Sequence, residues 1–79
     1  MAEQTTTAES LPRNQVADRL NDIASSLRGG EDLTVGVGNK DVTLQPPDSL
    51  NYRIDVIEKR SRFRGSRETV RIELDWKPE

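Results

Sequence analysis

Two stretches of this chain, LNYRIDV (residues 50–56) and VRIELDW (residues 70–76), alternate strictly between apolar and polar side chains. This period of two is typical of antiparallel strands with one dry face and one wet face. The stretches match best when Tyr52 faces Leu74, because opposite charges then face each other on the wet side, Arg53 with Glu73 and Asp55 with Arg71. A shift of two residues would place Asp55 opposite Glu73. Each cross-strand pair is worth only ~0.2–1 kcal/mol, so the preference for this register is modest.

In this register the dry face of the hairpin carries four apolar pairs, and the tip of the hairpin lies near Phe63. The expected pairs are Leu50–Trp76, Tyr52–Leu74, Ile54–Ile72 and Val56–Val70. We expect these side chains, Tyr52 and Trp76 included, to form the core beneath a helix.

Residues 10–28 predict that helix, because apolar residues recur at helical spacing and occupy one side of it. The stripe consists of Val16, Leu20, Ile23, Ala24 and Leu27. Ser10 is the expected N-cap and Pro12 suits the first turn. Gly29-Gly30 supplies the left-handed cap that ends the helix.

A second, shorter hairpin is expected between residues 33 and 44. Leu33, Val35 and Val37 alternate with small or polar residues, Gly38-Asn39 is a tight-turn signal, and Val42 and Leu44 follow at the same period. Pro46-Pro47 ends the second strand, because proline donates no ladder hydrogen bond.

The predicted fold is therefore α+β, with one amphipathic helix packed on a four-stranded antiparallel sheet. Residues 10–77 form a single domain. Residues 1–9 form either a flexible tail or a short extra edge strand at Thr5–Thr7.

The composition narrows the classes of function. The 79 residues contain no cysteine and no histidine, so thiolate chemistry and the commonest general base are missing. We expect no enzyme activity and no cofactor.

Asp18 and Asp22 share a helix face and could hold a hydrated cation, although a solvated acidic face is the more common arrangement. Gly36-Val37-Gly38-Asn39-Lys40 lacks the following helix that a phosphate-binding loop needs. No apolar run is long enough to span a membrane, and no signal peptide is evident, so we expect a cytoplasmic protein.

One short segment has a charge opposite to that of the remainder. The chain carries 12 Lys+Arg and 14 Asp+Glu, a net charge of −2, yet residues 59–67 contain five basic side chains and no acidic one. The candidate binding residues are Lys59, Arg60, Arg62, Phe63, Arg64 and Arg67. Arginines bind phosphate, and an aromatic side chain among them can stack on an exposed base. A solvated loop whose charges balance the acidic remainder is the simpler interpretation.

Three motifs resemble the amphi-Trp domain, a small family with many haloarchaeal members. They are VADRL (residues 16–20), DVTLQPP (residues 41–47) and RIELDW (residues 71–76). The resemblance covers roughly residues 10–77. It implies a salt-loving archaeal source, which agrees with the excess of Arg over Lys, and it implies no enzyme activity and no functional residues. The pattern often has Glu where this chain has Gln15, and its hairpin tip is shorter and less basic.

We therefore expect a non-catalytic interaction domain that binds a protein partner or a second copy of itself. The alternative is binding of nucleic acid or another polyanion through residues 59–67. Salt separates the two expectations, because phosphate contacts weaken steeply with salt and apolar interfaces do not.

Overall fold

The structure, a computed structural model, describes residues 3–30 and 32–78. One helix is followed by four strands: α1 (Arg13–Arg28), β1 (Leu33–Val37), β2 (Lys40–Leu44), β3 (Asn51–Lys59) and β4 (Arg67–Asp75). The predicted α+β class is confirmed, together with the order of the elements and the antiparallel pairing of consecutive strands.

The ends of α1 are set by backbone geometry. Pro12 rather than Ser10 is the N-cap, because its extended backbone (φ −57°, ψ 150°) directs its carbonyl oxygen to the amides of Gln15 (3.0 Å) and Val16 (3.2 Å). At the other end Gly29 is the C-cap, and Gly30 adopts the left-handed conformation (φ 72°) that the sequence predicts. Arg28 lies in the last turn, where a positive charge opposes the helix dipole favourably.

The hairpin formed by β1 and β2 packs against α1 through β1 and contains Leu33, the only buried residue among those that the structure describes. Val35 pairs with Val42, and Gly38 takes the positive φ (64°) of the tight turn. The hydroxyl groups of Thr34 and Thr43 share a hydrogen bond of 3.1 Å across the two strands. Leu33, at the start of β1, is 3% exposed.

The hairpin formed by β3 and β4 has the predicted register. Tyr52 faces Leu74, Ile54 faces Ile72 and Val56 faces Val70, so three apolar pairs share one face. Arg53 faces Glu73 and Asp55 faces Arg71 on the other face. The Arg53 side chain also approaches Asp55 along its own strand, with a distance of 3.4 Å between Nε and Oδ2.

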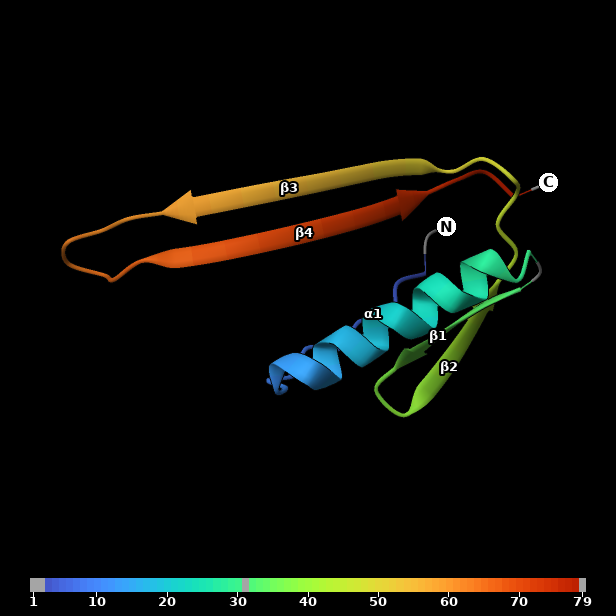
Figure 1. Cartoon of the computed structure of the whole chain (residues 1–79), viewed down its shortest axis with the longest axis horizontal. Coiled ribbons are helices and arrows are strands. Elements are labelled where there is room, and N and C mark those ends of the chain that lie inside the picture. Colours follow the sequence, from blue (N-terminus) through green and yellow to red (C-terminus); the bar gives the residue numbers. More distant parts are fainter. Residues whose placement is uncertain (1–2, 31, 79) are drawn as a thin grey trace.

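The four strands form two separate two-stranded sheets rather than one hydrogen-bonded sheet of four. The β3–β4 hairpin extends away from the other elements as a long arm (Figure 1). Within the described residues, β3 and β4 make no close backbone approach to α1, β1 or β2. The cause lies in residues 45–50, where Pro46 and Pro47 donate no hydrogen bond to extend the first sheet and the chain bends at Asp48.

The prediction that the apolar face of the longer hairpin forms a core beneath the helix is therefore wrong for the single chain. Tyr52 is 65% exposed and Leu20 is 50% exposed, whereas Trp76 is half-buried. Among the elements of the described ranges the helix packs on β1 alone, and most of the apolar face of the longer hairpin stays exposed.

The molecule is accordingly extended. Its radius of gyration is 15.3 Å, and its principal extents are 48 × 28 × 24 Å. A compact domain of this length would have a radius of gyration of about 12 Å.

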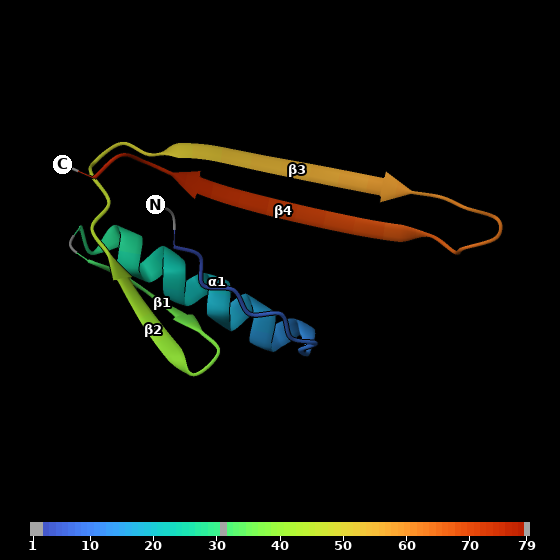
Figure 2. The ribbon, with the colours of Figure 1, turned by 180° about the vertical axis from the view of Figure 1, so that it is seen from behind.

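Residues 3–12 contain neither helix nor strand and run back along α1 (Figure 2). An ion pair of 3.0 Å between Arg19 and Glu9 ties this segment to the helix. Thr7 lies beside the β1–β2 turn, with its Oγ1 atom 3.7 Å from the position that a Cβ on Gly38 would take. The segment is unpaired at Thr5–Thr7, and Met1 and Ala2 lie outside the described residues.

Candidate binding surfaces

The basic residues gather at the tip of the β3–β4 hairpin. Lys59 ends β3 and faces Arg67, the first residue of β4, while Arg60, Arg62, Phe63 and Arg64 lie in the loop between them. Phe63 is 98% exposed, so its ring is open to solvent on all sides. The structure therefore brings all six predicted residues into one surface, the basic tip.

The loop at the basic tip is folded by its own serine. The Ser61 hydroxyl oxygen accepts hydrogen bonds from the backbone amides of Phe63 (3.3 Å) and Arg64 (3.1 Å). Serine commonly closes turns in this way, by accepting from amides two and three residues ahead. The bend places Phe63 at the far end of the hairpin.

The charges of the basic tip are not neutralised by salt bridges in the part of the chain that the structure describes. Carboxylates nevertheless lie close by. Glu58 faces Glu68, and this pair is the neighbour of the Lys59–Arg67 pair in the ladder. Both glutamates line a shallow cavity of about 260 Å³ together with Lys59, Arg60, Ser66 and Arg67. A phosphate bound at the tip would therefore meet two carboxylates on the strand side and only cations on the loop side.

A second surface is the apolar face of the same hairpin, and the sequence analysis assigned it to the core rather than to a site. Exposure is high along most of this face: Tyr52 65%, Ile54 48%, Val56 66%, Val70 64% and Ile72 48%, whereas Leu74 is half-buried. The strict alternation in residues 50–56 and 70–76 was the signal for this face. The alternation identifies a surface that must be covered, but it does not say by what.

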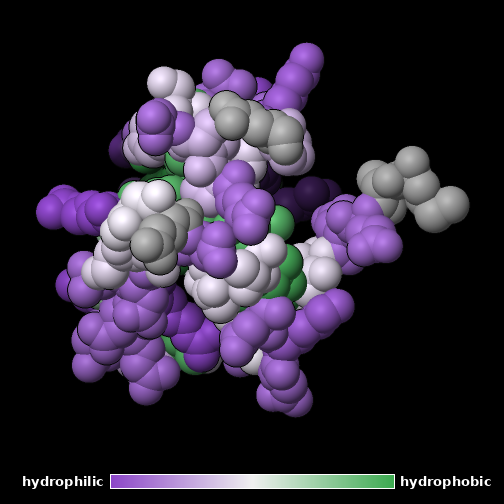
Figure 3. All heavy atoms as spheres, turned by 90° about the vertical axis from the view of Figure 1, so that its right-hand side faces the viewer, coloured by the Kyte–Doolittle hydropathy of each residue, from purple (hydrophilic) through white to green (hydrophobic). Residues whose placement is uncertain are grey.

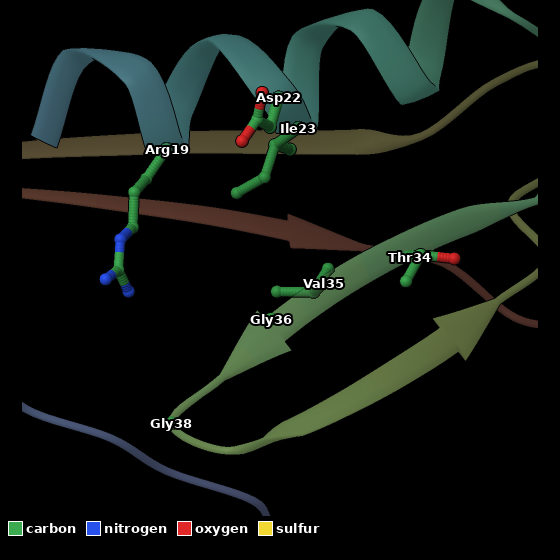
Figure 4. Close-up of a pocket in the computed structure, with 7 residues that line it drawn as sticks. All are labelled: Arg19, Asp22, Ile23, Thr34, Val35, Gly36 and Gly38. Atoms are coloured by element: carbon green, nitrogen blue, oxygen red, sulfur yellow. The ribbon is translucent and has the colours of Figure 1, made fainter. Parts of the chain in front are cut away.

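The apolar stripe of α1 is the third surface, and only part of it is covered. Ile23 and Leu27 are half-buried, whereas Val16 is 43% and Leu20 is 50% exposed. A cavity of about 290 Å³ separates α1 from β1, and the side chains of Ile23 and Val35 point into it (Figure 4). Arg19 and Asp22 border the same cavity from the helix.

Among the described residues, no three His, Cys, Asp or Glu side chains lie close enough together to hold a metal ion. Asp18 and Asp22 thus have no third side chain of these types close by among the described residues. No helix within the described ranges has the length and apolar character needed to cross a membrane.

The family follows from a comparison with known domains. The family model of the Amphi-Trp domain matches residues 1–79. The chain belongs to the Amphi-Trp domain family. The match confirms the resemblance seen in the three sequence motifs. No curated protein and no solved structure matches the chain.

The tryptophan of this Amphi-Trp domain follows β4 directly. Trp76 lines a shallow cavity of about 290 Å³ with Leu44, Leu74, Asp75 and Pro78, so it lies where the two hairpins meet. This end of the molecule shows hydrophobic side chains emerging between hydrophilic ones (Figure 3). Trp76 therefore helps to set how the β3–β4 hairpin leaves the remainder of the domain.

Proposed function

We propose that this Amphi-Trp domain is a non-catalytic interaction domain and that the apolar face of its β3–β4 hairpin is the binding surface. The observation that supports this proposal is the continuous row of exposed side chains on that face, from Tyr52 to Val56 on β3 and from Val70 to Ile72 on β4. A soluble domain rarely leaves such a face in water, and a contiguous exposed apolar patch commonly marks an interface.

The energetic reason is the hydrophobic effect. Fully burying one Val, Ile or Leu side chain is worth about 1.5–3 kcal/mol, and five large side chains of this face are about half exposed or more. A partner that covers them gains a large part of that free energy, minus the cost of association. Since the contact is apolar, it should persist at high salt.

The proposal is tested by affinity capture from native extract at low and high salt, with two single variants as baits. Ile72→Asn places an amide on the apolar face, whereas Arg71→Asn places the same amide on the opposite face of the same strand. We expect Arg71→Asn to retain the partners of the parent at both salt concentrations and Ile72→Asn to lose them. Equal capture by the two variants would contradict the proposal.

A second candidate is the binding of single-stranded nucleic acid or another polyanion by the basic tip. One observation favours it: Phe63 is almost fully exposed among arginines that no described carboxylate pairs with. Base stacking on an aromatic ring beside cationic side chains is a common mode of single-strand binding. The nearby Glu58 and Glu68 weigh against it, as does the screening of charge at high salt.

The cytoplasm of a salt-loving archaeon is the setting that we propose for this function. The negative net charge and the preference for Arg over Lys are consistent with a protein that stays soluble at high salt. An apolar binding surface would suit that setting better than a purely electrostatic one.

A further inference from the structure

We infer that the partner of the apolar hairpin face is a second copy of this chain, and that the two copies exchange their β3–β4 hairpins. The face of each hairpin then packs on the apolar stripe of α1 in the other copy. This inference rests on the proposed function and names its partner. Four observations support it: surface area, length, charge and the connection between the hairpins.

The surface area left in contact with water fits a missing interface of dimer size. The chain exposes 7782 Å². A compact monomer of 8.9 kDa would expose about 4,800 Å². The excess is about 3,000 Å² per chain, and obligate dimers bury about 2,000–5,000 Å² in total. Two copies together therefore have enough surplus surface for such an interface.

The two apolar surfaces in one chain also match in length, and β1 leaves Val16 and Leu20 of the helix stripe exposed while Ile23 and Leu27 are half-buried. The apolar pairs from Tyr52–Leu74 to Val56–Val70 extend over about 14 Å of strand. The stripe from Val16 to Leu27 extends over about 17 Å of helix. One helix can therefore cover the whole apolar face of one hairpin, as the sequence pattern predicts for an α+β domain.

The charges of the two halves are complementary. Residues 1–50, which include α1 and the first hairpin, carry 4 basic and 8 acidic side chains. Residues 51–79, which include the second hairpin, carry 8 basic and 6 acidic side chains. A hairpin half with a net charge of +2 is thus attracted to a helical half with a net charge of −4, and two hairpins or two helical halves repel each other.

The connection between the halves favours exchange over closure within one chain. Residues 45–50 are short, and Pro46-Pro47 stiffens them. In the structure this connection already holds β3 and β4 away from their own helix. Short hinge loops under strain promote the swapping of an element between two identical chains. In an exchanged dimer the same contacts are made between copies while the hinge keeps the course that it has in the single chain (Figure 1).

The first experiment measures the mass of the parent in solution by light scattering, across a range of concentrations and at both low and high salt. We expect twice the chain mass of 8.9 kDa under all these conditions. Ile72→Asn should shift the protein to monomer, whereas Arg71→Asn should remain dimeric. A parent that stays monomeric at high micromolar concentration overturns the inference.

The second experiment uses cysteine cross-linking, because the chain has no native cysteine. One preparation carries Leu20→Cys and the other carries Ile54→Cys, and the two are mixed under oxidising conditions. Exchange predicts a disulfide-linked pair of one copy from each preparation. Arg53→Cys replaces Ile54→Cys in the control, because Arg53 lies on the opposite face of β3 and should link poorly to Leu20→Cys. Equal yields from the two mixtures overturn the inference.

A chain that carries both Leu20→Cys and Ile54→Cys separates exchange from closure. Exchange gives linked dimers, whereas a disulfide confined to monomers means that the hairpin closes on its own helix and overturns the inference. Failure of the inference and failure of the proposed function are also distinguishable. A monomeric parent that still captures another protein through Ile72 refutes only the second copy as partner, while a monomer that captures nothing refutes both.

Discussion

Glu58 and Glu68 lie directly opposite each other across the β3–β4 ladder, on the same face as the three apolar pairs. Like charges in facing positions destabilise a sheet, and opposite charges stabilise it by about 0.2–1 kcal/mol. This pair marks the point where the apolar face of the hairpin ends and the basic tip begins.

Glu68→Lys should therefore raise the free energy of unfolding by about 0.2–1 kcal/mol, because the new lysine faces Glu58. Glu73→Lys is the matched control. It changes the net charge by the same amount, but places a lysine opposite Arg53 and should lower the stability. Thermal melts of both variants at the same protein concentration check the prediction. A shift in the same direction for both would contradict the register.

Gly38→Ala should cost about 1–2 kcal/mol, because the φ of Gly38 is +64° and an L-residue is strained in the left-handed region. Gly36→Ala is its control in the same hairpin. Gly36 has no positive φ, and a Cβ there would lie 3.6 Å from the Asp41 side chain, an ordinary contact. Gly36→Ala should be neutral or stabilising by up to about 1 kcal/mol. Urea titrations of the two variants would show whether the loss of stability comes from the backbone conformation of the turn or from the added methyl group itself.

Leu33→Ala should destabilise each chain by about 2–5 kcal/mol, because Leu33 is 3% exposed and its removal leaves a cavity between α1 and the first hairpin. Leu20→Ala should behave differently, because Leu20 is 50% exposed within its own chain. If α1 is covered by a second copy, Leu20→Ala lowers the melting temperature mainly by weakening the dimer, so its effect should be small where the parent is monomeric and should grow to a plateau as the protein concentration rises. A cost of Leu20→Ala that is already large at concentrations where the parent is monomeric would place Leu20 in the core of a single chain.

The basic tip gives a prediction that bears on the alternative function. If it binds phosphate, the parent should bind single-stranded nucleic acid at low salt, with a slope of log affinity against log salt of about 0.7 for each phosphate contacted. Reversing Arg62 and Arg64 to Glu should abolish the binding and leave the melting temperature nearly unchanged, since exposed loop charges add little to stability. Phe63→Ala should weaken binding by about 1–3 kcal/mol if a base stacks on the ring. Fluorescence anisotropy with a labelled oligonucleotide measures the affinity of the parent and of both variants. If the double variant binds as well as the parent, the basic tip is a solvated loop and not a binding site.

The local features of this fold were predictable, because each is set by residues that are close in sequence or that face each other across a short hairpin. The pairing of Tyr52 with Leu74 follows from alternation and from the match of Arg53 with Glu73. The end of α1 follows from Gly29-Gly30. The position of the N-cap was wrong by two residues, because Ser10 and Pro12 both suit a helix start and only the backbone geometry distinguishes them.

The candidate site was predictable in part. The basic tip could be located from its charge run, because a hairpin places the residues between its strands at one end. The apolar hairpin face could be identified residue by residue but not recognised as exposed, because periodicity gives the direction of a side chain and not the surface that covers it.

The sequence by itself therefore determined the elements, the register of the β3–β4 hairpin and the position of the six tip residues, since these depend on short-range spacing and on facing charges. Only the tertiary structure decided that α1 packs on β1 alone and that β3 and β4 form a separate sheet. The physical reason lies partly in residues 45–50, because the direction of the chain after Pro46-Pro47 depends on a few backbone angles. In addition, the hydrophobic effect is non-directional, so it does not specify which apolar face packs against which.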